Sequence, residues 1–352
     1  MQPWYATRED LKRSLGVKET AGANAAIDRA LGASSRSIEG LLHRRFYPEL
    51  ATRSWDWPNG QGTAPWRLRL DSNELISVEQ LLTGGQVIDA ANYFLRRADN
   101  RDDPPYTMLE LNLDSNAAFG GGPSTQRDIA VLGLYGYRND ETTAGTLAAG
   151  IGTTAANTIT VDGPASAAVG VGSLLRIDTE RVIVTERAQA DTGLTLAANV
   201  DASMKTVLIP LSGPGVAAGE TVLIDSEKMH VTDTVGNSLI VERQYDGLPL
   251  AAHTAGATVY APRLLTVARG VLGTTAAVHS NGATVQRFDW PGPVNELCIA
   301  EAESALLQSR AGWARTITSG TGGGKAATLD ALIDLREQVY TSHGRKGRVR
   351  VV

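Results

Sequence analysis

The chain has 352 residues, of which 42% are hydrophobic and 20% are charged, and its formal net charge is −5. This near-average composition excludes extensive disorder, and the length predicts two or three compact units. No apolar run approaches the roughly 20 residues that a membrane-spanning helix needs, and Met1-Gln2-Pro3-Trp4 does not begin a signal peptide. We therefore expect a folded protein without a membrane partner, and the net charge gives no global reason to bind nucleic acid.

The N-terminal segment has a helical pattern. Thr7 can cap a first helix over 8–15, with Glu9 and Asp10 in the first turn, where the helix dipole favours acids. A second helix is expected from about Ala23 to Arg45, because apolar residues recur there at helical spacing. The chain therefore begins with a helical pair.

From Arg53 the apolar period changes to two, which indicates strands and hairpins. Gly133 and Gly136 lie in the last of these strands and indicate a bulge or a close backbone approach. The expected strands lie within residues 53–57, 66–71, 75–85, 92–98, 108–114 and 127–140.

Residues 141–287 contain an internal repeat. The segment RQYDGLPLAAHTAGATV begins at Arg243, and RGVLGTTAAVHSNGATV begins at Arg269, 26 residues later. A second pair, GSLLRIDTERVIVTE and GETVLIDSEKMHVTD, begins at Gly172 and Gly219, and each predicts a hairpin around an Ile-Asp-x-Glu turn. The middle of the chain is therefore predicted to be an all-β domain of duplicated hairpins.

Helical spacing returns after Trp290, first over 291–313 and then over 327–340, and a basic tail follows over 341–352. Helical and mixed sequence thus brackets the β block, which indicates an insertion. We expect an α+β fold with a core formed by 1–140 and 288–340, an inserted domain at 141–287, and a flexible tail.

Two sets of residues in the repeat could carry chemistry. His253 and His279 occupy equivalent places, and we favour a turn role in which the imidazole bonds neighbouring backbone over metal binding. Asp178 with Glu180, and Asp225 with Glu227, are interpreted as parts of hairpin turns. A calcium site or a glycoside-cleaving pair is the alternative.

No other pattern indicates catalysis, and we predict that the protein is not an enzyme and has no cofactor or bound metal. The segment SGTGGGK at 319–325 lacks the Ser or Thr that a phosphate loop requires after Lys325, and is interpreted as a linker. Cys298 is the one cysteine and is expected to be a buried small apolar residue.

The flanking blocks resemble the head-to-tail adaptor, or connector, proteins of long-tailed bacteriophages. The likeness lies in the segment AAIDRALGASSRSIEGLLHRRFYPE, the paired strands, the strand DIAVLGLYGYRND and the helix that follows DWPGP. It covers roughly residues 5–140 and 288–340. The pieces IDSEKMHVTD and LTVARGVLGTTAAVHSNGATV are similar to β modules of phage structural proteins.

The resemblance implies a homo-oligomeric ring, in this family dodecameric, in the neck of the virion at the head–tail interface. Such a ring lies beneath the portal protein, joins it to a head-completion (stopper) or tail-terminator protein, and surrounds a channel through which genomic DNA passes without sequence-specific binding. The protein would be made in the host cytoplasm. The large β insert departs from compact members of the family.

In this family the C-terminal segment commonly reaches the portal, so the resemblance implies a docking role for the tail. A solvated tail and a strand added to a partner's sheet are the alternatives. The candidate portal-docking residues are Tyr340, Arg345, Lys346, Arg348, Val349, Arg350 and Val351. The alternative function is a tail, baseplate or host-binding virion protein whose β repeats bind a surface ligand.

Overall fold

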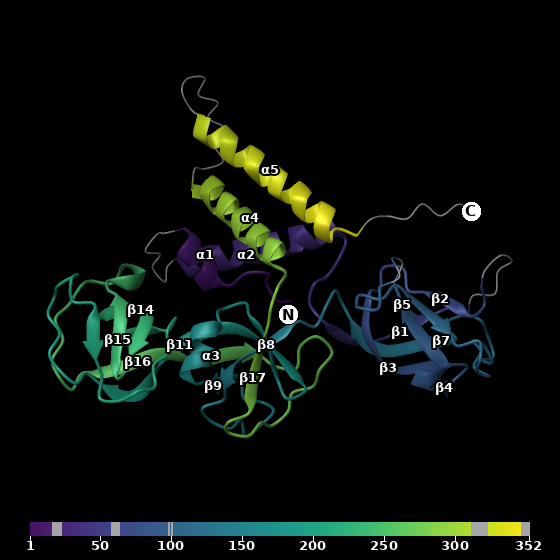
Figure 1. Cartoon of the computed structure of the whole chain (residues 1–352), viewed down its shortest axis with the longest axis horizontal. Coiled ribbons are helices and arrows are strands. Elements are labelled where there is room, and N and C mark those ends of the chain that lie inside the picture. Colours follow the sequence, from purple (N-terminus) through teal and green to yellow (C-terminus); the bar gives the residue numbers. More distant parts are fainter. Residues whose placement is uncertain (16–22, 58–63, 98, 100, 311–322, 346–352) are drawn as a thin grey trace. The chain divides into compact units, whose positions relative to one another are not determined.

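The computed structural model describes residues 1–15, 23–57, 64–97, 99, 101–310 and 323–345. The chain forms two compact units (Figure 1). The small unit consists of described residues within 42–140 together with Arg345, and the large unit of described residues within 1–41 and 141–344. Residues 1–41 therefore pack with 141–344, whereas the sequence-based division grouped them with 42–140. The fold combines helices with antiparallel sheets, in agreement with the predicted α+β class.

The small unit contains two antiparallel sheets, one in the order β1-β7-β3-β4 and one in the order β2-β6-β5. Alternating side chains, such as Leu81, Leu109 and Val131, form a shared apolar core. The elements are β1 (Glu49–Trp55), β2 (Arg67–Arg69), β3 (Leu75–Thr83), β4 (Gln86–Ile88), η2 (Ala90–Asn92), β5 (Tyr93–Arg96), β6 (Met108–Leu111) and β7 (Ile129–Tyr135). These strands confirm the predicted hairpins.

The backbone requires glycine at two positions, one within β7 and one just after its end. A Cβ atom on Gly133 would lie 2.5 Å from the carbonyl oxygen of Ser77, beside the irregular register of β3. Gly136 has a φ of +143°, a conformation that side chains other than glycine rarely adopt. The close backbone approach predicted for this segment is confirmed.

The longer helices of the large unit come from the two ends of the chain. In α1 (Arg8–Ser14), Thr7 and Asp10 form a reciprocal capping box, so the predicted cap is confirmed. The second helix, α2 (Asn24–Leu42), ends before the predicted Arg45, because His43 takes a left-handed φ of 51° that a helix cannot continue. Figure 1 shows α4 (Gly292–Arg310) beside α5 (Gly323–His343).

One face of α4 is buried through Val294, Leu297, Ala302 and Leu306, and the thiol of Cys298 is buried with it, as expected. Burial raises the pKa of Cys298 to about 11, so the thiol remains protonated at neutral pH. Residues 323–325, the end of the predicted linker, already belong to α5. None of the helices in the described residues is long and apolar enough to cross a membrane.

The rest of the large unit is a ten-stranded antiparallel sheet in the order β12-β15-β14-β13-β16-β11-β10-β17-β8, with β9 paired to β16. A short helix α3 (Gly163–Ala168) and a turn η3 (Tyr245–Gly247) accompany it. The strands are β8 (Glu141–Thr146), β9 (Thr158–Thr160), β10 (Leu174–Ile177), β11 (Glu180–Thr195), β12 (Leu208–Pro210), β13 (Thr221–Ile224), β14 (Glu227–Val235), β15 (Ser238–Glu242), β16 (Thr258–Ala268) and β17 (Thr284–Phe288).

Two copies of one module make up this sheet, and one is inserted into the other. The outer module comprises 141–187 and 263–288, and the inner module comprises 188–262. Their hairpins β10–β11 and β13–β14 have the same register, with Ile177 opposite Glu180 and Ile224 opposite Glu227. The long strands β11 and β16 pass from one module into the other and pair along most of their length. The duplication predicted from the sequence is therefore nested.

Each module has its own apolar core. Val161, Leu175, Val182 and Val285 belong to the core of the outer module. Ile209, Val222, Met229 and Val259 belong to that of the inner module. Each module thus buries the apolar face of its own strands, which is what a compact folding unit requires.

Candidate functional site

The candidate residues of the repeat lie at two equivalent hairpin turns. Asp178 and Asp225 are the first residues of two-residue turns and have left-handed φ values of 50° and 49°. Aspartate tolerates this conformation better than most residues because its short side chain bonds locally. The interpretation of both Asp-x-Glu segments as hairpin turns is confirmed.

Glu180 lies at the centre of the first set, the outer cluster, which we define as Asp178, Glu180, Arg269 and His279. The glutamate is fully buried. One carboxylate oxygen accepts hydrogen bonds from Nε of Arg269 at 2.7 Å and from the amide of Gly270 at 2.9 Å. The other accepts from Nη2 of Arg269 at 2.6 Å and from the amide of Ala277 at 3.0 Å.

The ring of His279 lies between two carboxylates. Its Nδ1 is 2.7 Å from Asp178 and its Nε2 is 2.9 Å from Glu180. The prediction that this imidazole bonds neighbouring backbone is wrong, because only the main chain of His279 does so, in a bridge with Ile151.

The inner cluster, defined as Asp225, Glu227, Arg243 and His253, repeats this geometry. Arg243 contacts Glu227 through Nε at 3.1 Å and through Nη2 at 2.6 Å. The ring of His253 is 2.7 Å from Asp225 and 3.1 Å from Glu227. The main chain of His253 bridges Val200, as that of His279 bridges Ile151. The duplication has therefore kept a whole bonding pattern.

The buried glutamates are held in their ionised form. Burial alone would raise the pKa of Glu180, but hydrogen bonds from Arg269, the Ala277 amide, His279 and the Gly270 amide together lower it to about 2. The pKa of Glu227 is lowered by the same combination of donors acting against burial. At neutral pH, each arginine is therefore paired with an ionised glutamate.

Both clusters use their hydrogen-bonding capacity within the fold. Five donors surround Glu180, so little lone-pair capacity is left for a metal ion or a substrate. Within the described residues no group of three or more His, Cys, Asp or Glu side chains is arranged to hold a metal ion. The outer cluster holds the loop before β17 against a hairpin turn. The inner cluster does the same for the loop before β16.

The candidate docking residues fall partly outside the described residues. Tyr340 lies near the end of α5 with 37% of its surface exposed. Arg345 donates its amide to the carbonyl of Leu42 at 2.9 Å, and its guanidinium contacts the carbonyl of Asp71. Lys346, Arg348, Val349, Arg350 and Val351 are not described.

The sequence did not predict that the arginine and histidine of each Arg-x₉-His segment contact the Asp and Glu of one hairpin turn. The order of the repeats along the chain could have indicated these contacts. The turn of the outer module precedes that of the inner module, whereas Arg243 of the inner module precedes Arg269 of the outer module. Such an order places one pair inside the other. A further match, LAAG at 147–150 and LAAN at 196–199, belongs to the same duplication.

Comparisons with models of known protein families, with curated proteins and with solved structures give no match.

Proposed function

We propose that the protein is a head-to-tail adaptor of a tailed bacteriophage, which forms a ring beneath the portal and joins the capsid to the stopper or tail. The order of the sequence blocks supports this assignment through its resemblance to that family. The proposal includes a dodecameric ring around the DNA channel, a location in the virion neck and no enzymatic activity.

The observation that carries the proposal is the weakly buried helix α5. Among its described side chains at 331–343, Val339 is the one that is buried. Ile333 is 50% exposed and Tyr340 is 37% exposed, and their spacing of seven residues puts them on one side of the helix. On the neighbouring helix α4, Leu307 is 55% exposed.

Such a helix is explained if another chain covers it. A ring closes through heterologous contacts, in which one surface of each subunit meets a different surface of the next. Each contact can then be modest, because closure of the ring makes the contacts mutually dependent. The α5 surface, defined as Ile333 and Tyr340, is our candidate for one side of this contact.

The test is mass photometry of the purified chain, alone and mixed with the portal protein of the same phage. We expect portal-bound oligomers whose mass corresponds to a ring of the chain. Replacing Ile333 and Tyr340 by glutamate should abolish these oligomers, because charges placed in an apolar contact lose their hydration.

The matched control is Val87→Glu, which changes a 57% exposed apolar residue in β4 of the small unit. It should leave the oligomers unchanged. A wild-type chain that stays monomeric with the portal protein at every concentration contradicts the proposal, as does a double variant that assembles normally.

A further inference from the structure

A polar cavity within the large unit belongs to neither histidine cluster. Its volume is about 420 Å³, within the range of small-molecule sites. Helix α1 forms one side, and strands β11 and β14 form the other. Six lining side chains concern the argument: Lys12, Arg13, Arg187, Gln189, Lys228 and His230.

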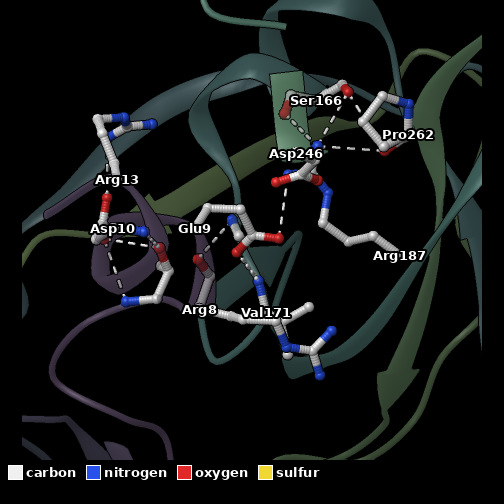
Figure 2. A network of polar contacts seen from close by, with 12 residues as sticks. Arg8, Glu9, Asp10, Arg13, Ser166, Val171, Arg187, Asp246 and Pro262 are labelled. Carbon is white, nitrogen blue, oxygen red and sulfur yellow. Dashed lines mark hydrogen bonds and ion pairs between the residues drawn. The ribbon is translucent and has the colours of Figure 1, made fainter. Parts of the chain in front are cut away.

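Basic side chains outnumber acidic ones around this cavity, although the whole chain is acidic. Six Arg and Lys residues line it, against four Asp and Glu residues. The acids are already engaged: Glu9 accepts the amide of Val171 at 2.8 Å and lies 3.5 Å from Arg187, and Asp246 pairs with Lys228 at 3.0 Å. Figure 2 shows Glu9 between Val171 and Arg187.

The basic groups retain unused donors. Arg187 is 12% exposed and gives Nη2 to the carbonyls of Ser166 and Pro262, yet its buried Nε has no partner (Figure 2). Within the described residues no ion pair is found for Lys12. The unfilled hydrogen-bonding capacity of these two residues is therefore that of positively charged donors.

Three further buried polar atoms around the same cavity lack partners: Oδ1 of Asn24, Oε1 of Gln189 and Nδ1 of His230. Buried polar groups in folded proteins nearly always have a hydrogen-bonding partner, which for such a group can be a water or a bound ion. Two of the four unpartnered atoms, on Asn24 and Gln189, are amide oxygens that accept hydrogen bonds, so an occupant must offer a donor, such as the hydroxyl of a hydrogen phosphate, as well as acceptors.

The two modules provide an internal comparison for the wall. His230 pairs with Thr221 across β13 and β14. The equivalent pair of the outer module is Leu174 with Ile183, and both of these residues are buried. The outer module folds with an apolar pair at these positions. The module fold therefore does not require the polar pair Thr221 and His230 of the inner module.

We propose that this cavity binds a small oxyanion, a phosphate or carboxylate group, with Arg187 as the main charged donor and His230 and Lys12 beside it. Guanidinium groups suit both anions because their parallel N–H bonds match two oxygens. Six basic side chains line the cavity against four acidic ones, and five of the six already contact an acid, so the positive charge left for an anion is the small excess of bases over acids. The inference is independent of the proposed adaptor function.

Isothermal titration of the full chain with sodium phosphate and with sodium citrate tests the proposal, using sodium chloride at matched ionic strength as the blank. We expect a single saturable site per chain for at least one of the two oxyanions. The stronger ligand distinguishes a phosphate from a carboxylate source. Arg187→Gln should weaken binding by about tenfold or more, as expected for loss of a charged hydrogen bond.

A second variant, His230→Ile, copies the residue of the outer module and keeps the test decisive if Arg187→Gln does not fold. It should also weaken binding. Arg101→Gln is the control, since Arg101 lies in the small unit and is 68% exposed. Absence of saturable binding by either oxyanion, or equal binding by wild type and both cavity variants, overturns the proposal.

Discussion

At the scale of the residue, the large unit is organised by two buried glutamates, each bound by one arginine and one histidine. Neither Glu180 nor Glu227 has exposed surface, so each charge depends on the protein for its solvation. The bidentate arginine supplies charge and geometry, and the backbone amides supply the remaining donors. The clusters therefore fix the position of a loop relative to a hairpin turn. Apolar packing alone would not fix it, because it is not directional.

Removal of one partner should be far more damaging here than at the surface. We expect Arg269→Met to lower the free energy of unfolding by about 3–5 kcal/mol, because Glu180 would remain buried without its counter-charge. Arg101→Met removes a pair with Asp99 in which both side chains are exposed, and should change it by about 0–1 kcal/mol. Urea denaturation measures both; equal losses would contradict the assigned role.

The glutamates also predict a dependence of stability on pH. The folded-state pKa of Glu180 is about 2, below its ordinary value of 4.5, so its contribution is present above pH 4.5 and is lost as the pH falls toward 2. We expect the free energy of unfolding to fall through this window. Glu180→Gln should flatten the fall, and a variant with the wild-type pH profile would show that Glu180 does not contribute.

At the scale of the element, β11 and β16 connect the two modules. Each strand gives one half to the outer module and the other half to the inner module. Since each module has a separate apolar core, the inner one resembles an insertion into a hairpin of the outer one. An insertion of this kind leaves the host sheet intact if its ends lie on paired strands.

Excision of the inner module tests this organisation. Ala188 pairs with Leu264, so replacing 189–263 by Asn-Gly should close a two-residue hairpin between them. We expect the shortened chain to retain a cooperative thermal transition in circular dichroism, because the outer core is complete without the inner module. The excised segment 189–263, which keeps the pair between Arg263 and the buried Glu220, should also fold when expressed alone. Loss of cooperative unfolding in both proteins would contradict the nested arrangement.

The sequence predicted local structure better than it predicted contacts between residues that are far apart in the chain. The cap at Thr7, the strands of the small unit, the buried Cys298 and the turns at Asp178 and Asp225 follow from local patterns, and the structure confirms them. The contacts of the histidine rings could not be read locally, because Asp178 and His279 are 101 residues apart. The early end of α2 depends on one left-handed residue, His43, for which helical periodicity gives no signal.

At the scale of the whole molecule, the proposed role assigns different contacts to different parts of the chain. The weakly buried surface of α5 would join subunits, while the β modules, rigidified by their buried clusters, would be available for other contacts. Stability within the modules and incompleteness at the helices are what an assembly protein requires. The polar cavity adds a site whose occupancy does not depend on that assembly.

Electron microscopy of a lysate from the phage with this gene deleted tests the central claim most directly, because the defect identifies the step at which the protein acts. The account predicts DNA-containing heads together with separate finished tails, and complementation in trans should restore joined particles. Complete but non-infectious particles would contradict the adaptor role and would direct attention to ligand binding by the β modules.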